Sequence, residues 1–486
     1  MHARLCRSGS GVFNTSRTVL TPPSHSSFES NMDPTLTGRA VGASIRQGNV
    51  GNMSNNDVTS SIEKNQAQLL NEERDHAIKY KTCSWQKTAA LLFSEYICLA
   101  VLSFPWSYSV LGLLPGIILT VSVAAIVLYT SLILWSFCLK HPQIRDVCDV
   151  GRILFGGSNL AYNVTALFFI LNNTFIQALH VVVGAELINT LSSSAACTVL
   201  FSAVTALACF FVSLPRTLDQ LSWLGSLSAA FTGLAILLAI IFAGIQDHPF
   251  GYVPGQEPIV TAFPVIGTTF VSGKCMSAFL NITYILVGQI TLPSFIAEMK
   301  DPREFPKALW AVTAAEIVVF SVCGSLQTTY QKIVFSFLTP TILFLGALYS
   351  SITSRFIFLR VLHGLYHCYS NTLTSWSIWV AIVAATWCLA FVIAEVIPFF
   401  SDMLSLMSSL FGDFIFWPMA YLQLYPKGMA RWNSPMRTME TIFNYFLVLL
   451  GFYVLIVGTY ISVDSIILSY QASQFSSTFS CASTSL

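Results

Sequence analysis

Long apolar segments alternate with short polar ones from about residue 86 onward. Each apolar segment holds about 20 residues or more, the length that an α-helix needs to cross the hydrocarbon core of a bilayer. The pattern indicates an all-α integral membrane protein. We predict eleven membrane-spanning helices, near residues 86–110, 114–138, 158–188, 195–214, 221–245, 276–298, 306–326, 333–360, 376–399, 402–424 and 440–463.

Composition agrees with this class and divides the chain into three parts. Hydrophobic residues make up 54% of the 486 residues and charged residues only 10%, which excludes a soluble protein. The net charge of +1 gives no reason to expect a nucleic-acid partner. Residues 1–82 are rich in Ser, Thr, Asn and Gly, and we predict a disordered tail there. The transmembrane domain is expected over residues 83–465, followed by a short tail over residues 466–486.

The Lys and Arg residues predict the orientation of the chain in the membrane. With the N-terminal tail in the cytosol, 22 of the 24 Lys and Arg residues lie on the cytosolic side, and only Lys274 and Lys332 lie outside. Cytosolic loops of membrane proteins carry such an excess of positive charge. We therefore expect a multi-pass membrane protein with a cytosolic N-terminus and a non-cytosolic C-terminal tail. The plasma membrane is expected in preference to the vacuolar membrane.

The sixth predicted span contains residues that interrupt a helix. Pro293 has no amide hydrogen to donate to the carbonyl of Gln289, and Gly288 lowers the cost of unwinding. Backbone groups that leave a helix at membrane depth must be buried in protein or line a polar cavity. Broken helices of this kind form the midplane binding sites of many secondary transporters.

The first predicted span has the same device. Residues 102–105 read aliphatic, hydroxyl, apolar, proline, as do residues 290–293, and Pro105 frees the carbonyl of Val101. The two spans run in opposite directions in the predicted topology. This pair indicates an inverted repeat.

The two breaks together predict a site for a small zwitterion. Amide hydrogens near residues 103–106 would face a carboxylate, and carbonyls near residues 99–101 and 287–289 would accept from an ammonium group. The aromatic residues Tyr284 and Tyr349 lie in the spans nearby, with no acid or base placed to pair a charged substrate side chain. Neutral amino acids are therefore the expected substrates.

Candidate substrate-binding residues lie at the breaks and on the third span. Asn173 and Gln177 are four residues apart on one face of that span, where a cavity wall and a helix–helix contact are equally favoured. We interpret His180, on the same span, as an interior hydrogen-bonded histidine in preference to a proton carrier. The candidate set is Leu99, Ala100, Val101, Ser103, Phe104, Asn173, Gln177, Tyr284, Gly288 and Gln289.

Two acidic residues at membrane depth are candidates for proton coupling. Glu95 precedes the first break by two helical turns, and Glu316 lies at a similar depth in the seventh predicted span. A carboxyl group that burial keeps protonated near the working pH can carry a proton across the membrane. The alternative for each is a structural acid that is hydrogen-bonded to a neighbouring helix.

A charged run follows the sixth span. Glu298, Lys300, Asp301 and Arg303 are predicted to form ion pairs that close the cytosolic mouth, and a solvated charged loop is nearly as well favoured.

The 12 cysteines lack the spacing of a metal or disulfide framework, although a bridge from Cys197 to Cys275 on the outer side stays open. We predict no metal and no cofactor, with the proton as the coupling ion.

Three stretches resemble a known family. The runs GQITLPSFIAEMKDPREFPKAL, SWQKTAALLFSEYICLAVLSFPWSY and LPRTLDQLSWLGSLS are similar to the amino acid/auxin permease family, in its branch of neutral amino acid permeases of filamentous fungi. The resemblance covers residues 72–470. It implies a five-plus-five inverted-repeat fold with an eleventh helix, broken first and sixth helices, and symport of an amino acid with a proton. Relatives usually carry glycine in the first break, where this chain has Cys98, Ala100 and Val101.

The sequence as a whole predicts a secondary active transporter and no enzyme. We expect proton-coupled symport of neutral aliphatic or aromatic amino acids by alternating access. The alternative is a sensor that binds an amino acid at the same site without transporting it. The expected partners are a small amino acid and the lipid bilayer, with no nucleic acid and no protein partner specified.

Overall fold

A computed structural model describes residues 83–96, 103–193, 195–216, 218–245, 273–323, 331–362, 372–397, 400–411, 416–425, 432 and 434–471. The regular structure within these ranges is helical, with one isolated β-bridge between Cys83 and Met299. Six helical segments of the described part are long and apolar enough to cross a membrane. The N-terminal tail, residues 97–102 of the first break and the C-terminal tail lie outside the described residues.

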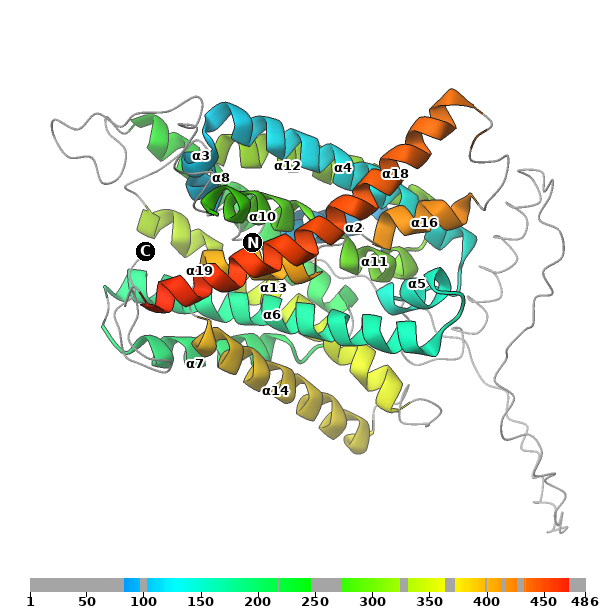
Figure 1. Cartoon of the computed structure of the whole chain (residues 1–486). Helices are drawn as coiled ribbons and strands as arrows, with labels where there is room; N and C mark the ends of the chain where they lie inside the picture. Colours follow the sequence, from blue (N-terminus) through cyan, green and yellow to red (C-terminus); the bar gives the residue numbers. More distant parts are fainter. Residues whose placement is uncertain are drawn as a thin grey trace, which may run out of the picture. The chain divides into compact units, whose positions relative to one another are not determined.

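The first half of the chain holds the helices α2 to α8 (Figure 1). These are α2 Trp85–Tyr96, α3 Phe104–Leu111, α4 Leu113–Lys140, α5 Val147–Leu154, α6 Asn159–Ser192, α7 Thr198–Val212 and α8 Leu218–Ile245.

The second half begins with the helices of the sixth and seventh spans. They are α10 Lys274–Leu286, the 3-10 helix η3 Gln289–Thr291, α11 Leu292–Glu298, the 3-10 helix η4 Pro302–Glu304 and α12 Phe305–Cys323. The remaining elements are α13 Gln331–Val361, α14 Leu373–Val396, α15 Phe400–Phe411, α16 Phe416–Leu424, α18 Pro435–Tyr453, the π-helical turn η6 Val454–Gly458 and α19 Thr459–Gln471. Figure 1 shows α18 and α19 running on as one long rod.

The sixth span is interrupted where the sequence predicts. α10 ends at Leu286, Val287 and Gly288 lie outside any helix, and α11 begins at Leu292. Pro293 lies in the first turn of α11, where its missing amide hydrogen costs nothing. One detail differs from the expectation: the carbonyl of Gln289 is not freed, because the amide of Leu292 donates to it in a 3-10 turn. The tighter turn satisfies the group that the proline would otherwise leave unpaired.

The described residues of the first span belong to α2 and α3. α2 ends at Tyr96 and α3 begins at Phe104, with Pro105 in its first turn. α3 packs beside α10, and α2 packs beside α8 and α12.

The apolar core is divided at the level of the breaks. Leu91 of α2 and Leu292 of α11 belong to one buried cluster, together with residues of α4, α5, α12, α13 and α16. Phe104 of α3 and Leu286 of α10 belong to a second cluster, with residues of α6, α14 and α15. Each broken span therefore contributes one half to each cluster.

The short helix α5 lies outside the predicted spans, in the segment between the second and the third. Its N-cap is Asp146, whose carboxylate accepts from the amides of Cys148 at 2.8 Å and Asp149 at 3.1 Å. Burial and the negative charge of Asp149 raise the pKa of Asp146 to about 6. A carboxyl group with a raised pKa binds its proton more tightly in the folded state. Its contribution to stability is therefore present at low pH and is lost as the pH rises through about 6.

Two substitutions at Asp146 separate its charge from its capping bond. Asp146→Ala removes the cap and should lower the free energy of unfolding by about 1 kcal/mol. Asp146→Asn keeps the capping oxygen and removes the charge, so its melting temperature relative to the wild type should rise between pH 5 and pH 7.5. Thermal unfolding of the purified protein at both pH values measures this difference. A difference that stays constant with pH would contradict the assigned pKa.

Candidate functional site

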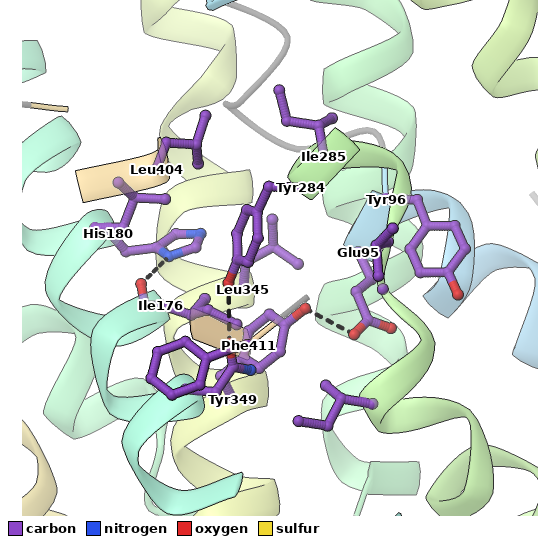
Figure 2. Close-up of a pocket in the computed structure, with 15 residues that line it drawn as sticks. Glu95, Tyr96, Ile176, His180, Tyr284, Ile285, Leu345, Tyr349, Leu404 and Phe411 are labelled. Carbon is purple, nitrogen blue, oxygen red and sulfur yellow. Dashed lines mark hydrogen bonds between the residues drawn. The ribbon is translucent and has the colours of Figure 1, made fainter. Parts of the chain in front are cut away.

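A pocket lies beside the break in the sixth span, between α2, α6, α10, α13 and α15 (Figure 2). Its walls are mainly apolar and aromatic, with a few polar groups. The lining residues are Glu95, Tyr96, Asn172, Ile176, Leu179, His180, Tyr284, Ile285, Val287, Gly288, Ile290, Leu345, Tyr349, Leu404 and Phe411.

Glu95 connects three elements at one side of this pocket. Its Oε1 accepts a hydrogen bond from the hydroxyl of Thr291 at 2.8 Å and another from the hydroxyl of Tyr349 at 2.8 Å. The side chain is only 3% exposed, and Oε2 has no partner among the described residues. The carboxyl group thus joins α2 to the interrupted sixth span and to α13. Figure 2 shows its contact with Tyr349.

Thr291 also holds the break itself. Its hydroxyl lies 3.0 Å from the carbonyl oxygen of Gly288, in addition to its contact with Glu95. The polar backbone at the break therefore has a partner in a side chain instead of in a helical turn.

Tyr284 and Gly288, two of the predicted binding residues, line the pocket. The ring of Tyr96 packs closely against the backbone of Gly288. Only glycine fits there, because a Cβ atom added at residue 288 would overlap ring carbons of Tyr96. Leu99, Ala100 and Val101 lie outside the described residues.

Gln289 points away from the pocket. Its Nε2 donates to the carbonyl of Val127 at 2.8 Å and lies 2.7 Å from the hydroxyl of Thr130 and 2.6 Å from that of Ser131, all on α4. The Gln289 side chain therefore anchors the break to α4 and does not line this pocket.

Ser103 and Phe104, also predicted to bind substrate, are buried but do not line this pocket. The ring of Phe104 stacks on that of Phe320, with 4.7 Å between the centroids. Phe104 therefore packs in the core.

On α6 the pocket is formed by a different face from the one predicted. Asn173 and Gln177 are fully buried and lie away from the pocket, whereas Asn172 and His180 line it. Asn172 accepts a hydrogen bond from the hydroxyl of Tyr284 at 3.2 Å. Pocket residues Asn172, Ile176, Leu179 and His180 follow helical spacing.

Glu316 is buried in α12 but lies apart from the pocket. It is 2% exposed, and its Oε1 has no partner among the described residues. Of the two candidates for proton coupling, only Glu95 lines the pocket.

About half of the chain matches a known protein family. Residues 81–327 match the family of transmembrane amino acid transporter proteins. The chain belongs to this family. It is therefore a membrane transporter and not an enzyme.

Two fungal relatives of this transporter cover almost its whole length. The N amino acid transport system protein of Neurospora crassa is 27% identical over 436 residues, which are 85% of this chain and 91% of that protein. A transmembrane transporter of Gibberella moniliformis is 23% identical over 444 residues, 88% of this chain and 93% of that protein.

A solved structure matches the fold of the transporter. MHP1, a nucleobase-cation-symport-1 family transporter in a closed conformation with bromovinylhydantoin bound, has a TM-score of 0.51 at 10% identity. The match covers 83% of this chain and 96% of that one. The chain therefore shares the inverted-repeat fold of such transporters, and the sixth span is broken as the sequence predicts.

Several contacts join α2, α11 and α13 at one end of the transporter. Glu298, at the end of α11, forms an ion pair with Arg355 of α13. Cys83 donates its amide to the carbonyl of Glu298 at 3.1 Å and accepts from the amide of Lys300 at 2.9 Å. These contacts join the start of α2 to the end of the sixth span.

The other members of the predicted charged gate have different roles. Lys300, Asp301 and Arg303 are exposed, and the Asp301 carboxylate caps η4 by accepting from the amide of Arg303 at 3.0 Å. Arg355 was missed because it lies far along the chain from the charged run. Cys275 is a free thiol, so the Cys197–Cys275 bridge is not formed.

We expect Gly288→Ala to reduce uptake by about tenfold or more, because overpacking against Tyr96 costs about 1–3 kcal/mol. Gly233→Ala is the matched control, since nothing lies within 4 Å of a Cβ added at Gly233 in α8. Uptake into vesicles containing equal amounts of inserted protein measures the effect. Equal uptake by the two variants would argue against a close approach at Gly288.

Removing the Glu298–Arg355 ion pair should weaken the contacts between the start of α2 and the end of α11. Arg355→Gln removes the positive charge of the ion pair with the buried Glu298, which should cost about 3–5 kcal/mol of stability and expose Cys83 to a water-soluble maleimide. Lys307→Gln is the control, because its pair with Glu304 is largely exposed and is worth at most about 1 kcal/mol. A Cys83→Ser background identifies the Cys83 signal. Unchanged Cys83 labelling in Arg355→Gln would show that this pair does not close the end.

Proposed function

We propose that this transporter is a proton-coupled symporter of neutral amino acids that works by alternating access. The observation that carries the proposal is the position of Glu95, where the pocket, the break in the sixth span and α13 meet. A substrate in the pocket and a proton on this carboxyl group would act on the same two helices.

The pocket chemistry supports a zwitterionic substrate. The backbone at Val287 and Gly288 leaves its helix beside the pocket and provides polar groups at membrane depth. The facing walls contain Ile176, Leu404 and Phe411, which suit an uncharged side chain.

Charge in the pocket supports the same substrate class. Among the described residues of the lining, Glu95 is the only carboxylate, and none is a Lys or Arg that would pair an acidic substrate side chain. If Glu95 carries the proton, no other described acidic residue of the pocket is left to pair with a basic substrate side chain.

Glu95 is proposed as the proton carrier, with two hydroxyl donors on Oε1 and a second oxygen available for the proton. Adding the proton would remove the negative charge that both hydroxyls stabilise, and this would alter the contact between α2, η3 and α13. Other parts of the proposal are a cytosolic N-terminus, location in the plasma membrane and no cofactor beyond the coupling proton.

Reconstituted vesicles with a pH gradient and a labelled neutral amino acid test the proposal. One coupled proton supports about tenfold accumulation for each unit of pH difference. Glu95→Gln should abolish this accumulation and retain exchange of labelled for unlabelled substrate, whereas Glu316→Gln should still accumulate. Unchanged accumulation by Glu95→Gln would remove Glu95 from the coupling role. Binding by the wild type without any flux would favour a sensor.

A further inference from the structure

His180 lines the pocket and has a buried, unused hydrogen-bond acceptor. The side chain is 4% exposed, and its Nδ1 lies 2.7 Å from the carbonyl oxygen of Ile176, one turn earlier in α6. Because a carbonyl oxygen can only accept, Nδ1 carries the hydrogen of this bond. In the neutral imidazole Nε2 is then an acceptor, and it has no partner among the described residues.

No described residue donates a hydrogen bond to Nε2 of His180. Figure 2 shows the imidazole pointing from α6 toward Tyr284. The hydroxyl of Tyr284 already donates to Asn172, and Leu179 and Leu404 on the nearby walls are apolar. A buried acceptor without a donor costs about 1–3 kcal/mol, so a molecule that brings a donor to Nε2 gains affinity.

Figure 2 shows His180 on the opposite side of the pocket from Glu95, and we therefore assign it to the side-chain end of a bound amino acid. Glu95 and Gly288 lie on the side of α2 and the sixth span, where the α-amino and α-carboxyl groups are proposed to bind. A substrate held there directs its side chain toward α6 and α15.

We propose that His180 determines specificity by accepting a hydrogen bond from the substrate's side chain. The favoured substrates are then neutral amino acids with a hydroxyl or amide donor, in preference to purely aliphatic ones of the same size. This inference rests on the proposed function, because it assigns the side-chain end of the same site.

Threonine and valine provide the sharpest probe, since they have nearly the same shape and differ by one hydroxyl group. The experiment measures binding of each to the purified full-length protein by calorimetry, and uptake of each into vesicles. In the wild type we expect threonine to be favoured over valine by about three- to tenfold, the worth of one net hydrogen bond. His180→Leu should abolish or invert this ratio while valine binding is retained.

Two further variants make the result specific to the acceptor. His180→Gln keeps an acceptor oxygen and should restore part of the preference for threonine. His141→Leu is the matched control, because His141 lies at the end of α4 and outside the pocket, and it should keep the wild-type ratio.

The possible results separate this inference from the proposed function. An unchanged ratio in His180→Leu overturns the inference and leaves the transporter proposal intact. Equal loss of both ligands in His180→Leu and His180→Gln also overturns it, and indicates that the ring binds a group common to all amino acids, such as the α-carboxylate. A wild type that neither binds nor transports any amino acid overturns both proposals.

Discussion

A peptide backbone that leaves its helix inside a bilayer has to find polar partners within the protein, because lipid offers none. This constraint determines what surrounds the break at Val287 and Gly288. The carbonyl of Gly288 faces the hydroxyl of Thr291, and the carbonyl of Gln289 accepts from Leu292 in a 3-10 turn. The Gln289 side chain holds the interrupted segment against α4. The pocket lies beside a break whose polar backbone groups have possible partners within the protein.

The same break separates two packed regions. Leu91 and Leu292 belong to one buried cluster and Phe104 and Leu286 to the other, so no continuous helix joins the clusters through the sixth span. Densely packed clusters resist deformation, and relative movement is concentrated where regular hydrogen bonding is interrupted. At the depth of the pocket the sixth span is therefore interrupted, whereas α4, α6 and α13 run unbroken and contribute residues to both clusters.

The location of the break could be predicted from the sequence because it depends on local chemistry. Pro293 and Gly288 limit helix formation wherever they occur in the chain. The direction of the Gln289 side chain could not be predicted, because it depends on the hydroxyls of Thr130 and Ser131, more than 150 residues away. Arg355 was missed as the partner of Glu298 for the same reason.

The periodicity of apolar residues also could not predict which face of α6 lines the pocket. α6 is surrounded by α5, α7, α13, α14 and α15, and 72% of its most apolar window is buried. A helix that is enclosed on most sides has no clear boundary between an apolar and a polar face. Both Asn173 and Asn172 are therefore buried, and only the packing shows which one meets the pocket.

The hydroxyl of Thr291 lies within hydrogen-bonding distance of two acceptors, Glu95 Oε1 and the Gly288 carbonyl oxygen, and it has a single hydrogen to give. It can satisfy one of them at a time. When the carboxyl group is neutral it can itself donate, and the threonine hydrogen is released to the peptide group. One rotatable O–H bond thus makes the main chain of the sixth span responsive to the charge on a side chain of the first.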